Sequence, residues 1–461
     1  MIRILEKLRK VAFWSLDWFK GGHVWKHYRE IRYIQQNPLS RRATGIKQEH
    51  LSKILDHAVK TVPFYAKFAS KKMDLTKFPI INKQLIRENF ETFRSHPYKN
   101  KYNHQVLTSG STGKPFRILQ DKSKRERNTA DTLFFAKRAG YDIGARLYYL
   151  RLWDKQYQKG KIQSFVQNLA TYSVDDLNDA NLAKLVQELE NDKSSINILG
   201  YTSALESICN YLDKHHGKPL KGNFCSIIAV AEALSNDVRQ KILKYFGVDA
   251  ISRYSNSENG ILAQRLPKCG SSSFEINWAS YFVELLDLNE DKPVKLGAPG
   301  RIVVTDLFNY SMPMLRYDTG DVGVMEQDPE NNELIFTKIE GRKMDMFTNT
   351  KGEYISSHII HHILQFRGIE QFQFIQEDYD QYVIKLKVSK KLDYEDELAL
   401  CGQYQEYFGA DANISVVYVE DIPLLPSGKR KLVLNNAILK QRKLAEKKSE
   451  EVTGSMAETG T

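Results

Sequence analysis

The sequence predicts an α/β protein with a large N-terminal domain followed by a small α+β domain. The chain has 461 residues, which is enough for a sizeable core and more than one domain. Helical and strand-like segments follow one another as far as Gly341. Beyond Gly341 the pattern changes to a shorter alternation of helix and strand. Its composition, 42% hydrophobic and 27% charged residues, is that of an ordinary soluble globular protein.

Residues 1–36 form a basic segment rich in aromatic side chains. Apolar residues recur there at helical spacing on one face, with lysine and arginine on the other side: Ile4, Leu5, Leu8, Val11, Ala12, Leu16 and Phe19. Trp14, Trp18 and Trp25 are three of the five tryptophans of the chain. We expect a helix packed on the main domain, with a membrane surface as the alternative partner.

The elements of the main region can be placed in order from their patterns. An apolar face predicts a helix over 51–62, ended by Pro63. An extended segment precedes a second helix that begins near Asn82, and 104–107 reads as a short strand entering a glycine loop. Residues 239–246 are helical in pattern, and 249–260 read as a strand that enters a turn. Residues 279–288 and 300–307 are strand-like because they are rich in β-branched and aromatic residues.

The small domain is expected to contain a helix over 356–366, a strand over 381–388, a helix over 394–408 and a strand over 413–419. The polar tail 443–461 is expected to be disordered. The charged run 121–127, DKSKRER, is interpreted as a solvated face.

Composition excludes several classes of protein. No apolar run approaches the ~20 residues that span a bilayer, and no secretory signal is apparent. Four cysteines lie far apart and form no CxxC pair, so neither a zinc ribbon nor a disulfide framework is indicated. The formal charge is +11, but no zinc finger, aromatic RNA-binding signature or basic-region helix is present. Nucleic acid is therefore not the expected ligand.

The stretch LTSGSTGKPFRI, residues 107–118, has the composition of a phosphate-binding loop. Its glycines let backbone N–H groups approach an anion, and hydroxyls and a lysine add donors and charge. A Walker A loop would need glycine where Thr108 stands and Ser or Thr where Pro115 stands. The loop alone is equally compatible with a hairpin turn carrying a solvated lysine.

Further motifs follow this loop in a fixed order. RYSNSENG places Glu258 in a turn after a strand, and MLRYDTGDVG carries Asp318 and Asp321 around Thr319-Gly320. IEGRKMDMF then leads into the small domain, and PLLPSGKRKL places Lys429 after a glycine. Each motif alone could be a turn, but the ordered set points to one site.

In this set of motifs the chain resembles the adenylate-forming superfamily of acyl- and aryl-CoA ligases, and within it the phenylacetate–CoA ligase family. The branch that it resembles most is found with capsular or exopolysaccharide genes. The resemblance extends from about Gln48 to Leu434 and includes FPIINKQLIREN and NILGYTSALESICNYL. It implies a large multi-layer domain with parallel sheets and helices, and a small mobile C-terminal domain.

The resemblance also implies roles for individual residues. Glu258 would coordinate Mg²⁺, and Lys429 would bridge the carboxylate and the α-phosphate. Asp321 would accept hydrogen bonds from both ribose hydroxyls, and Arg342 would also reach the ribose. The remaining positions would contact the phosphates, in the loop Thr108, Ser109, Gly110, Ser111, Thr112, Gly113 and Lys114, or would line the adenine site, at Ala231, Glu232, Tyr254, Ser255, Asn256 and Ser257.

Three positions depart from the family pattern. Ser255 stands where the family has glycine, and Thr202 replaces the usual proline of the acyl-pocket region. Met344 stands at the hinge position, which is usually Asp or Lys. The first departure bears on the shape of the acyl pocket, and the last bears on the rotation of the small domain. Ser203 and Asn256 are candidate pocket positions.

The expected function is ATP-dependent activation of a carboxylic acid as an acyl-adenylate, followed by transfer to a thiol such as CoA. One alternative passes the acyl group to a sugar amine or hydroxyl during polysaccharide biosynthesis, and another is a non-catalytic nucleotide-binding scaffold. The resemblance implies ATP, Mg²⁺ and CoA as cofactors. The scattered, unpaired cysteines indicate a cytoplasmic location, and residues 1–36 make the inner face of the membrane the alternative.

The expected domains are a basic helical segment (1–46), an ATP- and acyl-binding domain (47–341), a lid domain (342–442) and the tail (443–461). His358, His361 and His362 lie near one helical face, but no carboxylate is spaced to complete a zinc site. No G-x-S-x-G elbow is present, which argues against a hydrolase triad.

Overall fold

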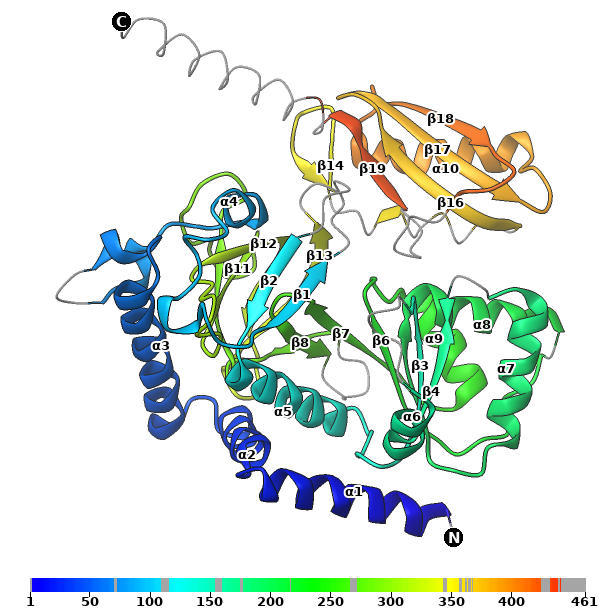
Figure 1. The fold of residues 1–461 in the computed structure, drawn as a ribbon. Helices are drawn as coiled ribbons and strands as arrows, with labels where there is room; N and C mark the ends of the chain where they lie inside the picture. Colours follow the sequence, from blue (N-terminus) through cyan, green and yellow to red (C-terminus); the bar gives the residue numbers. More distant parts are fainter. Residues whose placement is uncertain are drawn as a thin grey trace, which may run out of the picture. The chain divides into compact units, whose positions relative to one another are not determined.

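The computed structural model describes most of the chain and forms two compact units (Figure 1). The described residues are 2–69, 73–108, 116–153, 160–174, 177–215, 217–265, 272–342, 346–355, 359–360, 363, 366, 368–423, 432–437 and 440. The large unit comprises Met1–Thr319 and Gly323–Ile339, and the small unit comprises Gly320–Val322 and Glu340–Thr461. Among the described helices, none has both the length and the apolar composition needed to cross a bilayer.

Three helices begin the large unit: α1 (Ile2–Phe19), α2 (His23–Gln36) and α3 (Arg41–Thr61). Gly22 adopts φ 65° between α1 and α2, a conformation that glycine tolerates without a steric penalty. Ser40 caps α3 by accepting a hydrogen bond from the Ala43 N–H. The helix ends immediately before Val62-Pro63, as its sequence predicts.

The outward face of α1 corrects one expectation. The predicted apolar stripe does not pack on the main domain, because all seven of its residues are exposed. The buried residues of α1 are instead Glu6 and Asp17, two acids. The helix therefore docks on the large unit through its polar side.

A hairpin and short helices follow α3. The turns η1 (Ala66–Phe68), η2 (Leu75–Lys77) and η3 (His96–Tyr98) flank α4 (Lys83–Glu88), which Asn82 caps as predicted. The strands β1 (His104–Thr108) and β2 (Phe116–Gln120) pair antiparallel, with Thr108 opposite Phe116. The glycine loop thus connects two paired strands.

The main sheet has the strand order β10-β11-β12-β13-β9-β8-β7-β6-β5-β3-β4. Its parallel part comprises β4 (Leu169–Ser173), β3 (Arg146–Arg151), β5 (Ile196–Tyr201), β6 (Phe224–Val230) and β7 (Ala250–Asn256). The other strands are β8 (Gly260–Arg265), β9 (Phe274–Ile276), β10 (Tyr281–Leu286), β11 (Pro299–Asp306), β12 (Tyr317–Gln327) and β13 (Leu334–Arg342).

Helices complete the layers of the large unit: α5 (Lys122–Arg138), α6 (Lys161–Gln167), α7 (Asp179–Asn191), α8 (Thr202–His215) and α9 (Asn236–Phe246). One core lies between the parallel strands and α7, α8 and α9, with Ile198, Leu205 and Ile242 among its fully buried residues. The predicted fold class is thereby confirmed for this unit, and the predicted strands over 249–260, 279–288 and 300–307 are present.

One local interpretation is wrong. The run DKSKRER is not a solvated face, because Lys124 and Arg127 are fully buried on α5. Lys124 Nζ lies 2.6 Å from Asp306 Oδ2, and Arg127 Nη1 lies 2.7 Å from Glu30 Oε1. These partners are distant in sequence, and they supply the opposite charge that a buried cation requires. The motif YDTGDVG lies within β12, where Gly320 adopts φ 81°.

The small unit contains a four-stranded sheet in the order β18-β17-β16-β19 and the helix α10 (Tyr394–Phe408). Its strands are β16 (Ile369–Gln376), β17 (Gln381–Val388), β18 (Asn413–Tyr418) and β19 (Val433–Asn435), and a short hairpin pairs β14 (Phe347–Thr348) with β15 (Tyr354–Ile355). Aromatic residues fill the core, including Phe374, Tyr404 and Phe408. The predicted elements over 381–388, 394–408 and 413–419 are confirmed.

Candidate active site

The candidate site of the large unit is centred on Glu258, in the turn between β7 and β8. The Asn256 side chain accepts a hydrogen bond from the Asn259 N–H at 2.8 Å, which holds this tight turn. The Glu258 side chain is 2% exposed. A carboxylate buried to this degree requires partners, because an unpaired charge is costly to desolvate.

Among the described residues, two side chains contact the Glu258 carboxylate. Lys83 Nζ lies 2.9 Å from Oε1, and the Tyr317 hydroxyl donates a hydrogen bond to the same oxygen at 2.7 Å. Both contacts fall on Oε1. The backbone carbonyl of Glu258 also accepts a hydrogen bond from Gln120 Nε2 at 2.9 Å, which joins the turn to the end of β2.

Lys83 reaches Glu258 because the segment before it is hydrogen-bonded to the start of β12. Ile81 and Tyr317 form an isolated parallel bridge, in which the Ile81 N–H donates to the Arg316 carbonyl and the Asp318 N–H donates to the Ile81 carbonyl. Asn82 then caps α4, so Lys83 is the first residue of that helix. Sequence reasoning placed FPIINKQLIREN in the family but assigned no role to Lys83.

The glycine loop is tied to the same place through its flanking strands. Lys83 Nζ lies 5.7 Å from the centroid of the Phe116 ring, a cation–π distance, and Phe116 is opposite Thr108 in the hairpin. Residues 109–115, and the side chain of Thr108, lie outside the described part of the structure. The base of the loop, Lys83 and Glu258 therefore come from three distant segments and meet at one point.

Ala231 and Glu232 lie at the carboxyl end of β6, where ligands bind in open α/β sheets. Ala231 adopts φ 72°, a left-handed conformation that is uncommon for a residue with a side chain. The Glu232 carboxylate accepts a hydrogen bond from the Ser203 N–H at 2.8 Å, at the N-terminus of α8. Its carbonyl accepts one from the Thr202 hydroxyl at 3.1 Å. Thr202, which replaces the family's proline, thus links the start of α8 to the residues that follow β6.

The segment Tyr254–Ser257 completes β7 and enters the turn. The Tyr254 hydroxyl donates to Thr319 Oγ1 at 3.3 Å, and Thr319 Oγ1 donates to the Ile302 carbonyl at 2.9 Å. Ser255 and Ser257 are exposed. The pairing with β8 shifts register between Tyr254 and Ser255, at the position where the family has glycine. This irregularity re-aims the side chains that follow Tyr254.

A buried arginine lies directly before Tyr254. Arg253 Nε donates to Gln264 Oε1 at 2.9 Å, and burial lowers the pKa of the guanidinium to about 10. Sequence reasoning did not single out this residue. It adds positive charge to the strand that carries Tyr254 and leads into the Glu258 turn.

The two aspartates of β12 differ in their surroundings. Asp318 Oδ2 lies 2.8 Å from Arg301 Nη1, so this carboxylate is held by an ion pair with β11. Asp321, the predicted ribose ligand, follows Gly320 on the same strand. The Arg342 side chain, Lys429, Met344 and the three histidines at 358, 361 and 362 lie outside the described residues. Across the part of the chain that the structure describes, no group of three or more His, Cys, Asp or Glu could hold a metal ion.

Lys429 belongs to the connection between β18 and β19 in the small unit. On its N-terminal side, the Ile422 N–H donates to Gln371 Oε1 at 2.9 Å. On its C-terminal side, the Phe374 N–H donates to the Leu432 carbonyl at 2.8 Å. The two ends of this connection are therefore anchored on β16.

Comparisons with known proteins agree with this arrangement. Residues 347–436 match the CapK C-terminal domain family. The chain is 23% identical to protein CapK of Staphylococcus aureus over 442 residues, covering 90% of this chain and 94% of CapK. It is 21% identical to a phenylacetate–coenzyme A ligase of Escherichia coli strain K12 over 409 residues, covering 82% and 92% of the two chains.

Among solved structures, the chain is similar to a 2-hydroxyisobutyryl-CoA ligase in its postadenylation state, in complex with an acyl-AMP. The TM-score is 0.69 at 16% identity, and the match covers 89% of this chain and 92% of that ligase. The same ligase in its thioesterification state, in complex with an acyl-AMP and CoA, matches with a TM-score of 0.56. This likeness establishes the fold.

Proposed function

Because the chain belongs to the adenylate-forming superfamily, in the branch with CapK and the phenylacetate–CoA ligases, we propose that it activates a carboxylic acid with ATP and transfers the acyl group to CoA. The observation that carries this proposal is the meeting of Lys83, Glu258 and Tyr317 at the base of the glycine loop. A buried carboxylate fixed beside a lysine, next to a loop rich in backbone donors, suits a nucleotide triphosphate and its metal.

The residues present fit a magnesium ion at Glu258. Oxygen ligands are those that Mg²⁺ prefers, and both described contacts of the carboxylate use Oε1, so Oε2 is the oxygen that we assign to the metal. When bound, the metal offsets negative charge on the phosphates. The ammonium of Lys83 adds a second positive charge at the same carboxylate. Tyr317 fixes the orientation of the carboxylate.

The first reaction brings two anions together, since a carboxylate attacks the α-phosphorus of ATP and pyrophosphate leaves. Orientation and positive charge are what the protein contributes. In our proposal Lys429 supplies a cation where charge develops on the phosphorus, and Asp321 and Arg342 orient the ribose. Removing one such contact typically costs ~3–4 kcal/mol in the barrier. The thiol of CoA then attacks the acyl carbon, and AMP leaves.

A second class of acceptor is the alternative. We keep transfer to a sugar amine or hydroxyl in polysaccharide biosynthesis as the alternative, since the chain is similar to CapK over most of its length. The two reactions differ in what releases AMP. We expect AMP release to be accelerated by CoA if the acceptor is the thiol, and by an amino sugar or a glycan if it is not.

The decisive assay is acid-dependent exchange of labelled pyrophosphate into ATP, carried out across a panel of carboxylic acids. Exchange with at least one acid supports adenylation. Exchange that requires Mg²⁺ and is weakened by Glu258→Gln, with the need for Mg²⁺ shifted to higher concentration, supports the metal assignment. No exchange with any acid, by protein that still binds ATP, favours the non-catalytic nucleotide-binding scaffold.

A further inference from the structure

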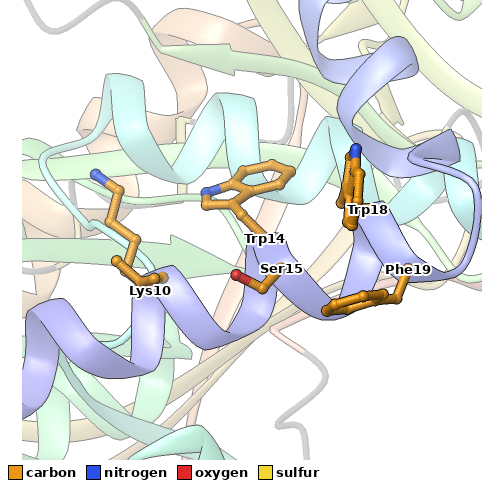
Figure 2. Close-up of a pocket in the computed structure, with 6 residues that line it drawn as sticks. Lys10, Trp14, Ser15, Trp18 and Phe19 are labelled. Carbon is orange, nitrogen blue, oxygen red and sulfur yellow. The ribbon is translucent and has the colours of Figure 1, made fainter.

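The first helix of the chain presents its apolar side to the outside. The outer face of α1 consists of residues that are 44% to 77% exposed: Ile4, Leu5, Leu8, Val11, Leu16, Trp18 and Phe19. Figure 2 shows Trp14, Trp18 and Phe19 projecting from α1, where with Lys10, Val11 and Ser15 they line an open hollow. A set of adjacent, exposed apolar side chains such as this one marks an interaction surface.

The polar side of α1 holds the helix in place. Glu6 Oε1 accepts a hydrogen bond from the Ser195 N–H at 3.0 Å, and Lys10 Nζ lies 2.7 Å from Asp142 Oδ2. A Cβ atom at Gly144 would lie 2.3 Å from the Glu6 carbonyl oxygen, so the helix backbone rests directly on this glycine. At the other end, Asp17 accepts hydrogen bonds from the first N–H groups of α2. The apolar face is therefore directed outward by fixed contacts.

A second element extends the patch. The short helix α6 exposes Ile162, Phe165 and Val166, each by 59% or more. Arg9 of α1 lies over the Phe165 ring at 5.3 Å, so the two helices are neighbours, as Figure 1 also shows. The outer face of α1 and these three residues of α6 together form what we call the α1–α6 surface.

The exposed charges of α1 and α2 have one sign. Both acids of α1, Glu6 and Asp17, are buried and engaged in hydrogen bonds. The exposed charged residues of α1, of α2 and of the turn between them are basic: Arg3, Lys7, Lys20, Lys26, Arg29 and Arg32. Basic side chains beside tryptophan and aliphatic residues are typical of helices that lie in the plane of an anionic membrane surface.

We propose that the α1–α6 surface docks this protein on an anionic lipid bilayer, with α1 lying in the headgroup region. The exposed tryptophan and phenylalanine side chains enter the interface, and the basic residues contact lipid phosphates. Pairing of two copies through this face would bring two sets of basic side chains together, which disfavours a second copy as the occupant. The proposal does not depend on the reaction that the site catalyses.

The test uses the full chain and vesicles of phosphatidylcholine, alone or with about 30 mol% phosphatidylglycerol. We expect co-sedimentation with the anionic vesicles only, a blue shift of tryptophan fluorescence on binding, and release at about 0.5 M NaCl compared with about 0.1 M. The triple variant Leu8→Gln, Val11→Gln and Phe19→Gln should lower the partition coefficient by more than about tenfold. The charge variant Lys7→Glu with Lys20→Glu should lower it comparably.

The matched control carries Leu39→Gln, Leu296→Gln and Leu398→Gln, three exposed leucines outside the α1–α6 surface. It should bind vesicles as the unaltered protein does. Circular dichroism and thermal melting check that each variant is folded. The proposal would be overturned if the folded, unaltered protein did not bind, or if it self-associated in a way that the triple variant abolishes while vesicle binding is absent. Equal loss of binding in the control would do the same.

Discussion

Lys83 and Glu258 are 175 positions apart in sequence, yet their ion pair, 2.9 Å between Nζ and Oε1, joins the start of α4 to the turn after β7. The pair combines a carboxylate that is 2% exposed with a lysine that is 34% exposed. Water can therefore reach the cation, whereas the anion depends on the protein for its partners. This asymmetry makes Lys83 the side of the pair at which substitution is most informative.

We predict that Lys83→Met destabilises the large unit by about 1–3 kcal/mol. The substitution leaves the buried Glu258 carboxylate with the neutral Tyr317 hydroxyl as its donor. Lys83→Arg, which keeps the charge, should recover most of the loss. The measurement is the apparent Tm in thermal melting. Lys53→Met is the control, since its ion pair with Glu49 is exposed at both ends. If Lys83→Met and Lys53→Met melt alike, the ion pair has no structural role.

We predict that Tyr317→Phe lowers the rate of acid-dependent exchange by about tenfold or more, because it removes a hydrogen bond to a charged group worth ~1.5–3 kcal/mol. The Mg²⁺ concentration needed for half-maximal exchange should rise as the carboxylate loses its fixed orientation. Tyr65→Phe provides the comparison, as its buried hydroxyl donates to the Pro313 carbonyl outside the site. A normal Mg²⁺ dependence in Tyr317→Phe would argue against the metal assignment.

The buried pair Lys124 and Asp306 should be essential for stability. Lys124→Met leaves a fully buried aspartate without its cation, and we expect a loss of about 3–5 kcal/mol. Adding Asp306→Asn removes the stranded charge and should restore part of that loss. Lys122→Met, two residues earlier on α5 and 80% exposed, should change little. Unfolding in denaturant gives the comparison, and additive effects of the two substitutions would contradict a direct ion pair.

Glu333 should make stability depend on pH. Burial, with the nearby Glu275 charge, raises the pKa of Glu333 to about 7. The folded state therefore keeps a proton that the unfolded state loses above pH 4.5, so this group's contribution to stability falls as pH rises from 4.5 to 7. Glu333→Gln should raise Tm at pH 8, and the gain in the free energy of unfolding should be no more than about 3 kcal/mol. Near pH 4 the substitution should have little effect.

For this prediction, Glu330→Gln on the same connection is the control, since Glu330 is exposed. Both variants are melted at a series of pH values between 4 and 8. A gain for Glu333→Gln that is the same at every pH would mean that the substitution acts through packing and not through titration.

Much of the fold could be predicted from local pattern. The helix ended by Pro63, the cap at Asn82 and the strands over 279–288 and 300–307 depend on neighbours in sequence, and all are present. The motif YDTGDVG has the composition of a turn, but here Gly320 permits a positive φ within a strand. Pairing with β11 and β13 outweighs the local preference.

What escaped prediction depends on contacts between distant segments. Lys124 and Arg127 look like surface residues until Asp306 and Glu30 are placed beside them. Lys83 gains its place only through the bridge between Ile81 and Tyr317. The apolar stripe of α1 has the period of a core-facing helix, and period alone does not say which side of a helix docks. The roles of the nucleotide-site residues stay predictions.

The most direct measurement compares acid-dependent pyrophosphate exchange in the unaltered protein, in Lys429→Ala and in Lys431→Ala, with ATP binding measured in parallel. We expect exchange to fall by ~10²–10³ in Lys429→Ala while ATP still binds, because the lysine acts on charge that develops during the reaction. Lys431→Ala should retain exchange. Full exchange in Lys429→Ala would contradict adenylation through this lysine.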